Sequence, residues 1–290
     1  MTESNSPSAG GAEGPDAAAP PHDAAAPSRS AAGAGSASGE EGSGDTTDRV
    51  LRLLWRRQLG APRGSRGPRQ KVSIDRIVEA AIELADADGL AAVSVRKVAQ
   101  RVGLSPMSLY TYVPDRDALI ALMVDEATSR TPLPRGEGEV RERLRALSDL
   151  IWDESLRHPW LPDAQGHRPW IGPGVSDRYE AELSAIEGCG LDDIAMNHTI
   201  ALLGTHAAAA ARRYLEAQRV LEETGQSDLE WWERHGAVLE QVIPADAYPV
   251  SGRVGTTVGT TYQAVTSIRA EYEFGRETIL DGVRARLDRS

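Results

Sequence analysis

The chain has 290 residues, 40% of them apolar, and a formal net charge of −11. This length and apolar content suffice for one or two folded domains. A single cysteine, Cys189, excludes an intrachain disulfide and a cysteine-rich metal site. No stretch reaches the roughly 18 apolar residues that a membrane span needs, and the N-terminus lacks the apolar run of a secretory signal. We therefore expect a cytoplasmic protein with no membrane partner.

The first 48 residues consist mainly of Ala, Gly, Ser, Pro and acidic residues, with no Leu, Ile, Val, Phe, Tyr or Trp. Such a segment cannot bury enough apolar surface to offset the entropy that a backbone loses on ordering. We predict that residues 1–48 form a disordered acidic tail.

Residues 49–71 are basic: positions 51–71 hold seven Lys and Arg residues and no acid. Leu51, Leu54, Trp55 and Leu59 recur at helical spacing, which predicts an amphipathic helix from residue 47 to about 60. Its apolar stripe is expected to pack on the next domain; binding to a membrane surface is the less favoured alternative for so short a segment. The rest, to residue 71, is expected to form a flexible basic arm. Such a patch attracts phosphate whatever the total charge.

Residues 72–130 predict a helix-turn-helix domain. Four helices are expected, each opened by a capping residue: Ser73, Ser94, Ser105 and Asp115. Gly103 supplies the turn between the second and third helices, and Pro106 occupies the first position of the third, where its missing N–H is harmless. Short helices joined through a glycine turn are typical of DNA-binding helix-turn-helix units.

The third helix carries an unusual outer surface. Leu109 and Val113 are spaced to anchor it in the core. This places the remaining residues on or near its outer faces: Pro106, Met107, Ser108, Tyr110, Thr111 and Tyr112. Short polar, methyl-bearing and aromatic side chains suit close approach to base edges in a major groove. The alternative, an ordinary surface helix, does not account for the unpartnered aromatic residues.

Cations flank this helix at positions that are unfavourable without an anion. Arg96 and Lys97 lie in the first turn of the second helix and Arg116 in the first turn of the fourth, where a positive charge opposes the helix dipole. A bound phosphate would reverse this penalty. We therefore expect Arg96, Lys97, Arg116 and the arm to hold the DNA backbone.

Residues 77–126 resemble the N-terminal domain of the tetracycline-repressor (TetR) family, including Gly89-Leu90 after the first helix and the Leu-Tyr-x-Tyr-Val sequence of residues 109–113. A weaker similarity to the C-terminal domain of the tetracycline-repressor branch covers RHPWLPD (157–163), GHRP (166–169), GLDD (190–193) and EFGRETILDGV (273–283). Together the two similarities cover most of the chain from about residue 72.

The resemblance implies an all-α homodimer that binds a near-palindromic double-stranded operator as a repressor, on the nucleoid, and releases it when a small molecule fills the C-terminal domain. The DNA-binding residues that it implies, with the cap of the third helix, are Arg96, Lys97, Ser105, Met107, Ser108, Tyr110, Thr111, Tyr112 and Arg116.

The chain departs from the family pattern at several positions. Tyr112 stands where His is common and Pro114 where Lys is common, so base preference cannot be transferred. The metal-chelating His of tetracycline-binding members aligns with Ala164, and their acidic ligand falls near Arg213. We therefore expect no magnesium-tetracycline complex, metal or cofactor.

Residues 138–290 are predicted to form an α-helical ligand-binding and dimerisation domain, with helices at 140–157, 174–188, 192–224, 228–243 and 260–287. The Gly/Thr-rich stretch 252–261 is expected to be a loop, and the helices at 192–224 and 260–287 are candidates for the dimer interface. Candidate pocket residues are Trp152, Trp160, His167, Trp170 and His206. Each of the tryptophans could equally serve the core or the dimer interface.

Two other functional classes are alternatives to a ligand-released repressor. The chain contains no G-x-G-x-x-G, P-loop, H-E-x-x-H or G-x-S-x-G motif, which argues against an enzyme. A DNA-binding regulator without a small-molecule inducer, whether constitutive, an activator or responsive to a protein, would show the same sequence features.

Overall fold

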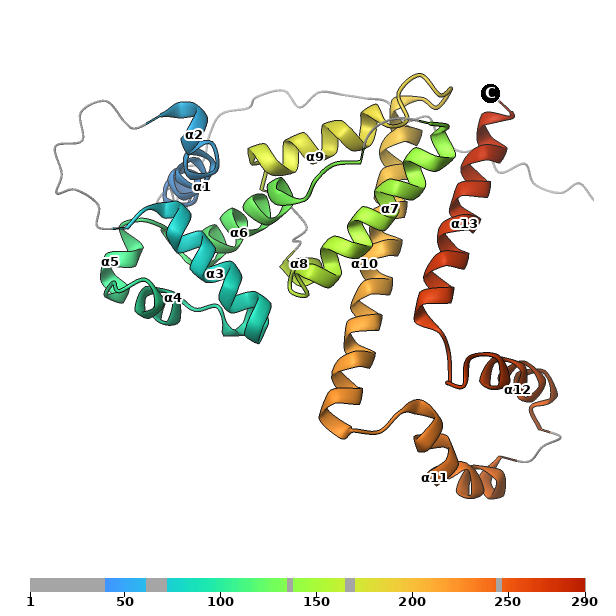
Figure 1. The fold of residues 1–290 in the computed structure, drawn as a ribbon. Coiled ribbons are helices and arrows are strands. Elements are labelled where there is room, and N and C mark those ends of the chain that lie inside the picture. Colours follow the sequence, from blue (N-terminus) through green and yellow to red (C-terminus); the bar gives the residue numbers. More distant parts are fainter. Residues whose placement is uncertain (1–39, 61–71, 135–137, 165–169, 244–246, 290) are drawn as a thin grey trace, which may run out of the picture. The chain divides into compact units, whose positions relative to one another are not determined.

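A computed structural model describes residues 40–60, 72–134, 138–164, 170–243 and 247–289. All regular structure in this part of the chain is helical, which confirms the predicted all-α class (Figure 1). The predicted tail up to residue 39, the basic arm at 61–71 and His167 lie outside the described residues. No described helix is both long and apolar enough to cross a bilayer.

The N-terminal basic segment folds as two helices, α1 (Glu40–Leu54) and α2 (Arg56–Leu59), which meet at Trp55. Residues 40–48 are thus helical, and the expected end of the tail at residue 48 is wrong. Of the predicted apolar stripe, Leu54 is buried in the core of the following helices and Leu51 and Trp55 pack partly against it, but Leu59 is exposed. Val50, which was not predicted for the stripe, is buried as well. The helix forms because this packing offsets the weak intrinsic helicity of its first residues.

The two arginines that begin α2 form ion pairs within the protein. Arg57 forms ion pairs with Asp75 (3.1 Å) and Glu126 (3.2 Å), and Arg56 also pairs with Asp75. These contacts attach α2 to the helices that begin and end the next domain.

The helix-turn-helix domain contains α3 (Ile74–Asp88), the short 3₁₀ helix η1 (Leu90–Ala92), α4 (Val95–Arg101), α5 (Pro106–Tyr110) and α6 (Arg116–Arg130). Its four predicted caps are confirmed: Ser73, Ser94, Ser105 and Asp115 each accept a backbone N–H three residues ahead. Gly103 adopts φ +70° at the turn between α4 and α5, a conformation that favours glycine.

The C-terminal helices are α7 (Val140–Arg157), α8 (Leu161–Ala164), α9 (Pro173–Ser184), α10 (Asp193–Thr224), α11 (Asp228–Val242), α12 (Pro249–Tyr262) and α13 (Ile268–Leu287). The long α10 packs against both α7 and α13 (Figure 1). Leu144, Leu203 and Leu280, one from each of these helices, share a buried core.

The Gly/Thr-rich stretch at 252–261 is helical, so the predicted loop is wrong. Pro249 opens α12 at a position where its missing N–H costs nothing, and the hydroxyls of Thr256 and Thr260 donate to carbonyls four residues earlier. The last helix consequently begins at Ile268 rather than at residue 260. None of the described side chains of α11 or α12 is buried.

Candidate DNA-reading face and ligand cavity

The outer surface of α5 is short and uncharged. Leu109 is fully buried, whereas Met107 is 76% exposed and Tyr110 43% exposed. Ser105 accepts the N–H of Ser108 at 3.1 Å, and their hydroxyls lie 2.8 Å apart, so both serine side chains take part in the cap. Met107, Tyr110 and the exposed Thr111 therefore form the free outer surface of this helix.

Tyr112 does not belong to that surface. Helix α5 ends at Tyr110, and Tyr112 lies in the following turn with only 7% of its surface exposed, packed in the same core as Leu109 and Val113. The expectation that it lies on an outer face is therefore wrong. The turn rotates the chain, so the helical spacing used to place Tyr112 no longer applies.

The end of α5 is held by a residue from outside the helix-turn-helix. A guanidinium N–H of Arg49, on α1, donates to the carbonyls of Tyr110 (3.3 Å) and Thr111 (3.2 Å). These carbonyls lie at the helix C-terminus, where a positive charge is favourable. Arg49 therefore fixes the orientation of α5 relative to α1.

The three flanking cations have different surroundings. Arg96 and Lys97 are exposed in the first turn of α4. Arg116 instead donates to the carbonyls of Val93 and Leu90, each at 2.8 Å, although its side chain reaches the surface. Arg96 and Lys97 are thus placed to meet an anion, and Arg116 links α6 to the segment preceding α4.

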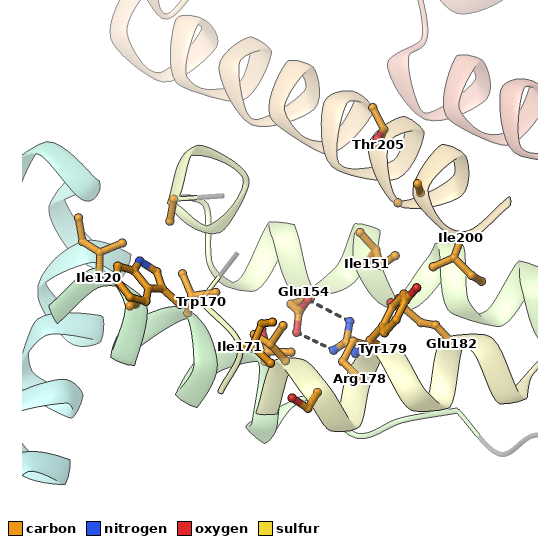
Figure 2. Close-up of a pocket in the computed structure, with 18 of the residues that line it drawn as sticks. Ile120, Ile151, Glu154, Trp170, Ile171, Arg178, Tyr179, Glu182, Ile200 and Thr205 are labelled. Carbon is orange, nitrogen blue, oxygen red and sulfur yellow. Dashed lines mark hydrogen bonds and ion pairs between the residues drawn. The ribbon is translucent and has the colours of Figure 1, made fainter. Parts of the chain in front are cut away.

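A cavity of about 1160 Å³ is bordered by α6, α7, α9 and α10. Figure 2 shows Ile120 and Trp170 toward one end and Ile200 and Thr205 toward the other. The wall of the cavity is largely apolar. Its volume is somewhat larger than the roughly 300–1,000 Å³ of pockets that bind drug-sized molecules. The cavity can accommodate a large, partly aromatic organic compound.

Two of the lining residues, Glu154 and Arg178, form a buried ion pair. Arg178 on α9 donates to both carboxylate oxygens of Glu154 on α7, at 2.8 and 3.3 Å (Figure 2). One turn further along α9, Glu182 is 9% exposed and makes no hydrogen bond to any described group. Burial raises the pKa of Glu182 to about 7, with the Arg178 charge lowering it and the Glu154 charge raising it.

The cavity is joined to α6 through the start of α9. The carboxylate of Asp125, on α6, accepts the N–H of Val175 at 3.0 Å and so caps α9 from another helix. At Gly172 and Gly174 a Cβ atom would lie within 2.4 Å of Asp125 atoms, which only glycine avoids. This close contact means that a displacement of α9 has to move α6 or break the cap.

The N-terminal helices reach the cavity as well. The indole N–H of Trp55 donates to the carbonyl of Ile171 at 2.8 Å, and Ile171 lines the cavity. Helix α1 therefore contacts α5 through Arg49, and its C-terminal neighbour Trp55 contacts the cavity wall.

Of the aromatic residues predicted for the pocket, Trp170 lines the cavity, but Trp152 and Trp160 do not. Trp152 is buried against Tyr272, with ring centroids 4.4 Å apart. Trp160 is buried in the core of the helix-turn-helix domain and donates its indole N–H to Asp86 at 2.7 Å. Both predictions were wrong, because residue type alone does not determine whether a ring faces the core or the cavity.

His206 is also outside the cavity lining, contrary to prediction. Its Nε2 lies 2.9 Å from the carbonyl oxygen of Tyr272, and a Cβ at Gly275 would lie 2.3 Å from its ring. The histidine fills the contact between α10 and α13, where glycine allows close approach. Its role in the described structure is helix packing.

Sequence reasoning missed Glu154, Arg178 and Glu182. The spacing of Arg178 and Glu182 is that of an ordinary solvent-exposed pair on a helix. The only trace in the sequence is that charged residues interrupt the apolar pattern of α9 on its inward face. This trace could not be recognised from the sequence, because the inward face of α9 is known only from the structure.

Two parts of the chain match models of known protein families. Residues 77–123 match the family model described as bacterial regulatory proteins, tetR family. Residues 131–287 match the tetracyclin repressor-like C-terminal domain.

Two similar individual proteins come from Streptomyces species. The HTH-type transcriptional repressor DrrR1 of Streptomyces coeruleorubidus is 37% identical over 245 residues, which is 83% of this chain and 87% of that protein. The structure of ActR from Streptomyces coelicolor in complex with actinorhodin is 25% identical, with a TM-score of 0.62, and covers 76% of this chain and 99% of that one. Apo ActR gives 26% identity and a TM-score of 0.61 over 75% of this chain and 97% of that one. The chain belongs to the TetR family of helix-turn-helix transcriptional regulators.

Proposed function

We propose that this protein is a homodimeric repressor that binds a near-palindromic operator in the cytoplasm and leaves it when an organic ligand fills the cavity. One observation carries the proposal: α6, which follows the reading helix α5 in the chain, also forms a wall of the cavity through Ile120 and Val124. A ligand in that space acts directly on the helix-turn-helix domain.

The DNA contacts proposed for α5 rest on its exposed surface. Met107, Tyr110 and Thr111 are free to meet base edges, with Ser105 and Ser108 close to the backbone at the helix start. Arg96 and Lys97 are exposed and are proposed to bind phosphates of the DNA backbone. For Arg116, whose Nε and one Nη are used internally, a phosphate contact would require a remaining guanidinium N–H.

Release by a ligand follows from the Asp125 cap. If a bound molecule displaces α9, it strains the bond between Val175 and Asp125 and shifts α6. Because α5 and α6 share a buried core at Leu109 and Leu119, α5 moves with α6. In a dimer such a movement alters the separation of the two reading helices, which has to match one helical turn of DNA.

Dimerisation through α10 and α13 is supported by the large apolar side chains that these helices expose. Phe274 on α13 is 77% exposed, and Ile194 and Leu202 on α10 are more than half exposed. Covering such residues is a normal source of dimer stability.

A response to an organic compound is supported by a similar protein. ActR has been solved in complex with actinorhodin, and the cavity of about 1160 Å³ in this chain is large enough to hold an organic molecule. The name of DrrR1 as a repressor supports repression as the direction of regulation.

The proposal is tested by selecting duplexes from random DNA and counting protein chains per site by sedimentation. Two chains on a near-palindrome, with log K falling against log salt, support it. If no sequence is enriched by protein shown by mass spectrometry to be ligand-free, the proposed operator binding is wrong.

A regulator without a small-molecule inducer is the alternative. It predicts that extracts of organic compounds never release the operator, although the selection succeeds. The large cavity next to α6 argues against it.

A further inference from the structure

The charges of the cavity do not balance. Its described lining has five acidic side chains and two basic ones: Asp117, Glu154, Asp163, Glu180 and Glu182 against Arg116 and Arg178. Arg178 is neutralised by Glu154, and Arg116 is used by backbone carbonyls. Asp163 forms an ion pair with Arg212 at 2.6 Å. No lining cation is left to neutralise Glu182.

Glu182 differs from the other unpaired acids in the lining because it is buried. Asp117 and Glu180 are exposed, whereas 91% of the surface of Glu182 is covered. The charged groups that act on it are Arg178 from its own helix and Glu154 from α7. The lining residues of α10 are uncharged. A buried carboxylate without a partner is costly, and a cation brought by a ligand would relieve that cost.

We propose that the ligand is an organic amine: a largely apolar body in the cavity and a protonated amino group hydrogen-bonded to the carboxylate of Glu182. This inference rests on the proposed ligand-binding role of the cavity and names the class of compound for it. An alkylamine with a pKa of about 10 is protonated at neutral pH, so it pairs with an ionised Glu182. The raised pKa of Glu182 means that such binding releases a proton from the protein near neutral pH.

Arg178 does not favour an anionic ligand. Its charge is already matched by Glu154, and its Nε–H, which has no hydrogen-bond partner in the described part of the chain, is buried. An anionic ligand would add a second negative charge near Glu182 and is disfavoured.

Three anthracenes of similar shape test the proposal on the full-length protein without DNA: 9-(aminomethyl)anthracene, 9-anthracenemethanol and 9-anthracenecarboxylate. Fluorescence anisotropy gives the three dissociation constants. We expect the amine to bind about 10- to 100-fold more tightly than the alcohol, as for a hydrogen bond between charged groups, and the carboxylate to bind most weakly.

Two variants assign the preference to its residue. Glu182→Gln should reduce the ratio between amine and alcohol to about one, whereas Glu187→Gln, which removes an exposed acid outside the cavity lining, should leave it unchanged. Equal binding of amine and alcohol by the unmodified protein would overturn the amine proposal but leave the ligand cavity intact. Binding of none of the three probes would count against both the amine and the proposed use of the cavity.

Discussion

Arg49, on a helix that lies outside both matched family regions, donates a guanidinium N–H to the carbonyl of Tyr110 at the end of the reading helix. The same group reaches the carbonyl of Thr111. The structure thus makes an N-terminal extension part of the support for the surface that is proposed to read DNA.

Arg49→Gln is therefore expected to weaken specific operator binding by about three- to tenfold, because α5 loses a charge-assisted hydrogen bond that orients it. The slope of log K against log salt should not change, since Arg49 acts on a carbonyl rather than on a phosphate. Arg52→Gln, at an exposed position on the same helix, is the matched control. A lower salt slope for Arg49→Gln would instead indicate a direct phosphate contact.

Tyr110 is expected to contribute directly to operator recognition. Tyr110→Ala should weaken specific binding by about 1–3 kcal/mol and leave binding to random duplex nearly unchanged. Tyr262→Ala, at a similarly exposed tyrosine of α12, should change neither. The measurement is anisotropy titration with operator and random duplexes; equal affinities for the Tyr110 variant and the unmodified protein would remove Tyr110 from the interface.

Glu182 should lower stability at alkaline pH. Its folded pKa of about 7 lies above the usual value, so the folded state holds the proton more tightly, and stability falls as pH rises from about 4.5 through 7. Glu182→Gln cannot ionise and should be more stable than the unmodified protein by about 1–3 kcal/mol at pH 8, with the difference shrinking toward pH 5. Urea unfolding at both pH values measures this, with Glu187→Gln as the control; a difference independent of pH would contradict the buried-carboxyl explanation.

Phe274 is expected to anchor the dimer. Phe274→Glu places a charge on an apolar contact of α13 and should shift the protein from dimer to monomer in sedimentation experiments, with a cost of about 2–4 kcal/mol typical of a central interface residue. Val254→Glu, on exposed α12, tests whether any new surface charge has this effect. A dimeric Phe274 variant would place the interface elsewhere.

The helix-turn-helix was predictable because its signals are local. Ser73, Ser94, Ser105 and Asp115 each satisfy backbone groups within three residues, so their sequence positions fix where the helices begin. Tyr112 was not predictable in the same way, because the turn after Tyr110 ends the helical spacing.

The cavity depends on contacts between distant parts of the chain. Glu182 is buried near the charge of Glu154, which lies on another helix, and Trp152 is excluded from the cavity by its stacking on Tyr272 some 120 positions later. Neither contact has a local signature. Helix α12 was missed for a different reason: Gly and Thr favour loops on average, but its threonine hydroxyls bond within the helix.

The most direct measurement of the central claim, that occupancy of the cavity controls DNA binding, uses variants that fill it. Ala201→Trp and Gly204→Phe add aromatic volume at two lining positions of α10, and at Gly204 a Cβ would point to Ile151 in ordinary contact (3.6 Å). The account predicts that both variants, folded by circular dichroism, bind the selected operator at least about tenfold more weakly without any ligand. Gln218→Trp, on the exposed part of α10, should bind normally. Unchanged operator affinity in both filled variants would contradict the coupling between cavity and reading helix.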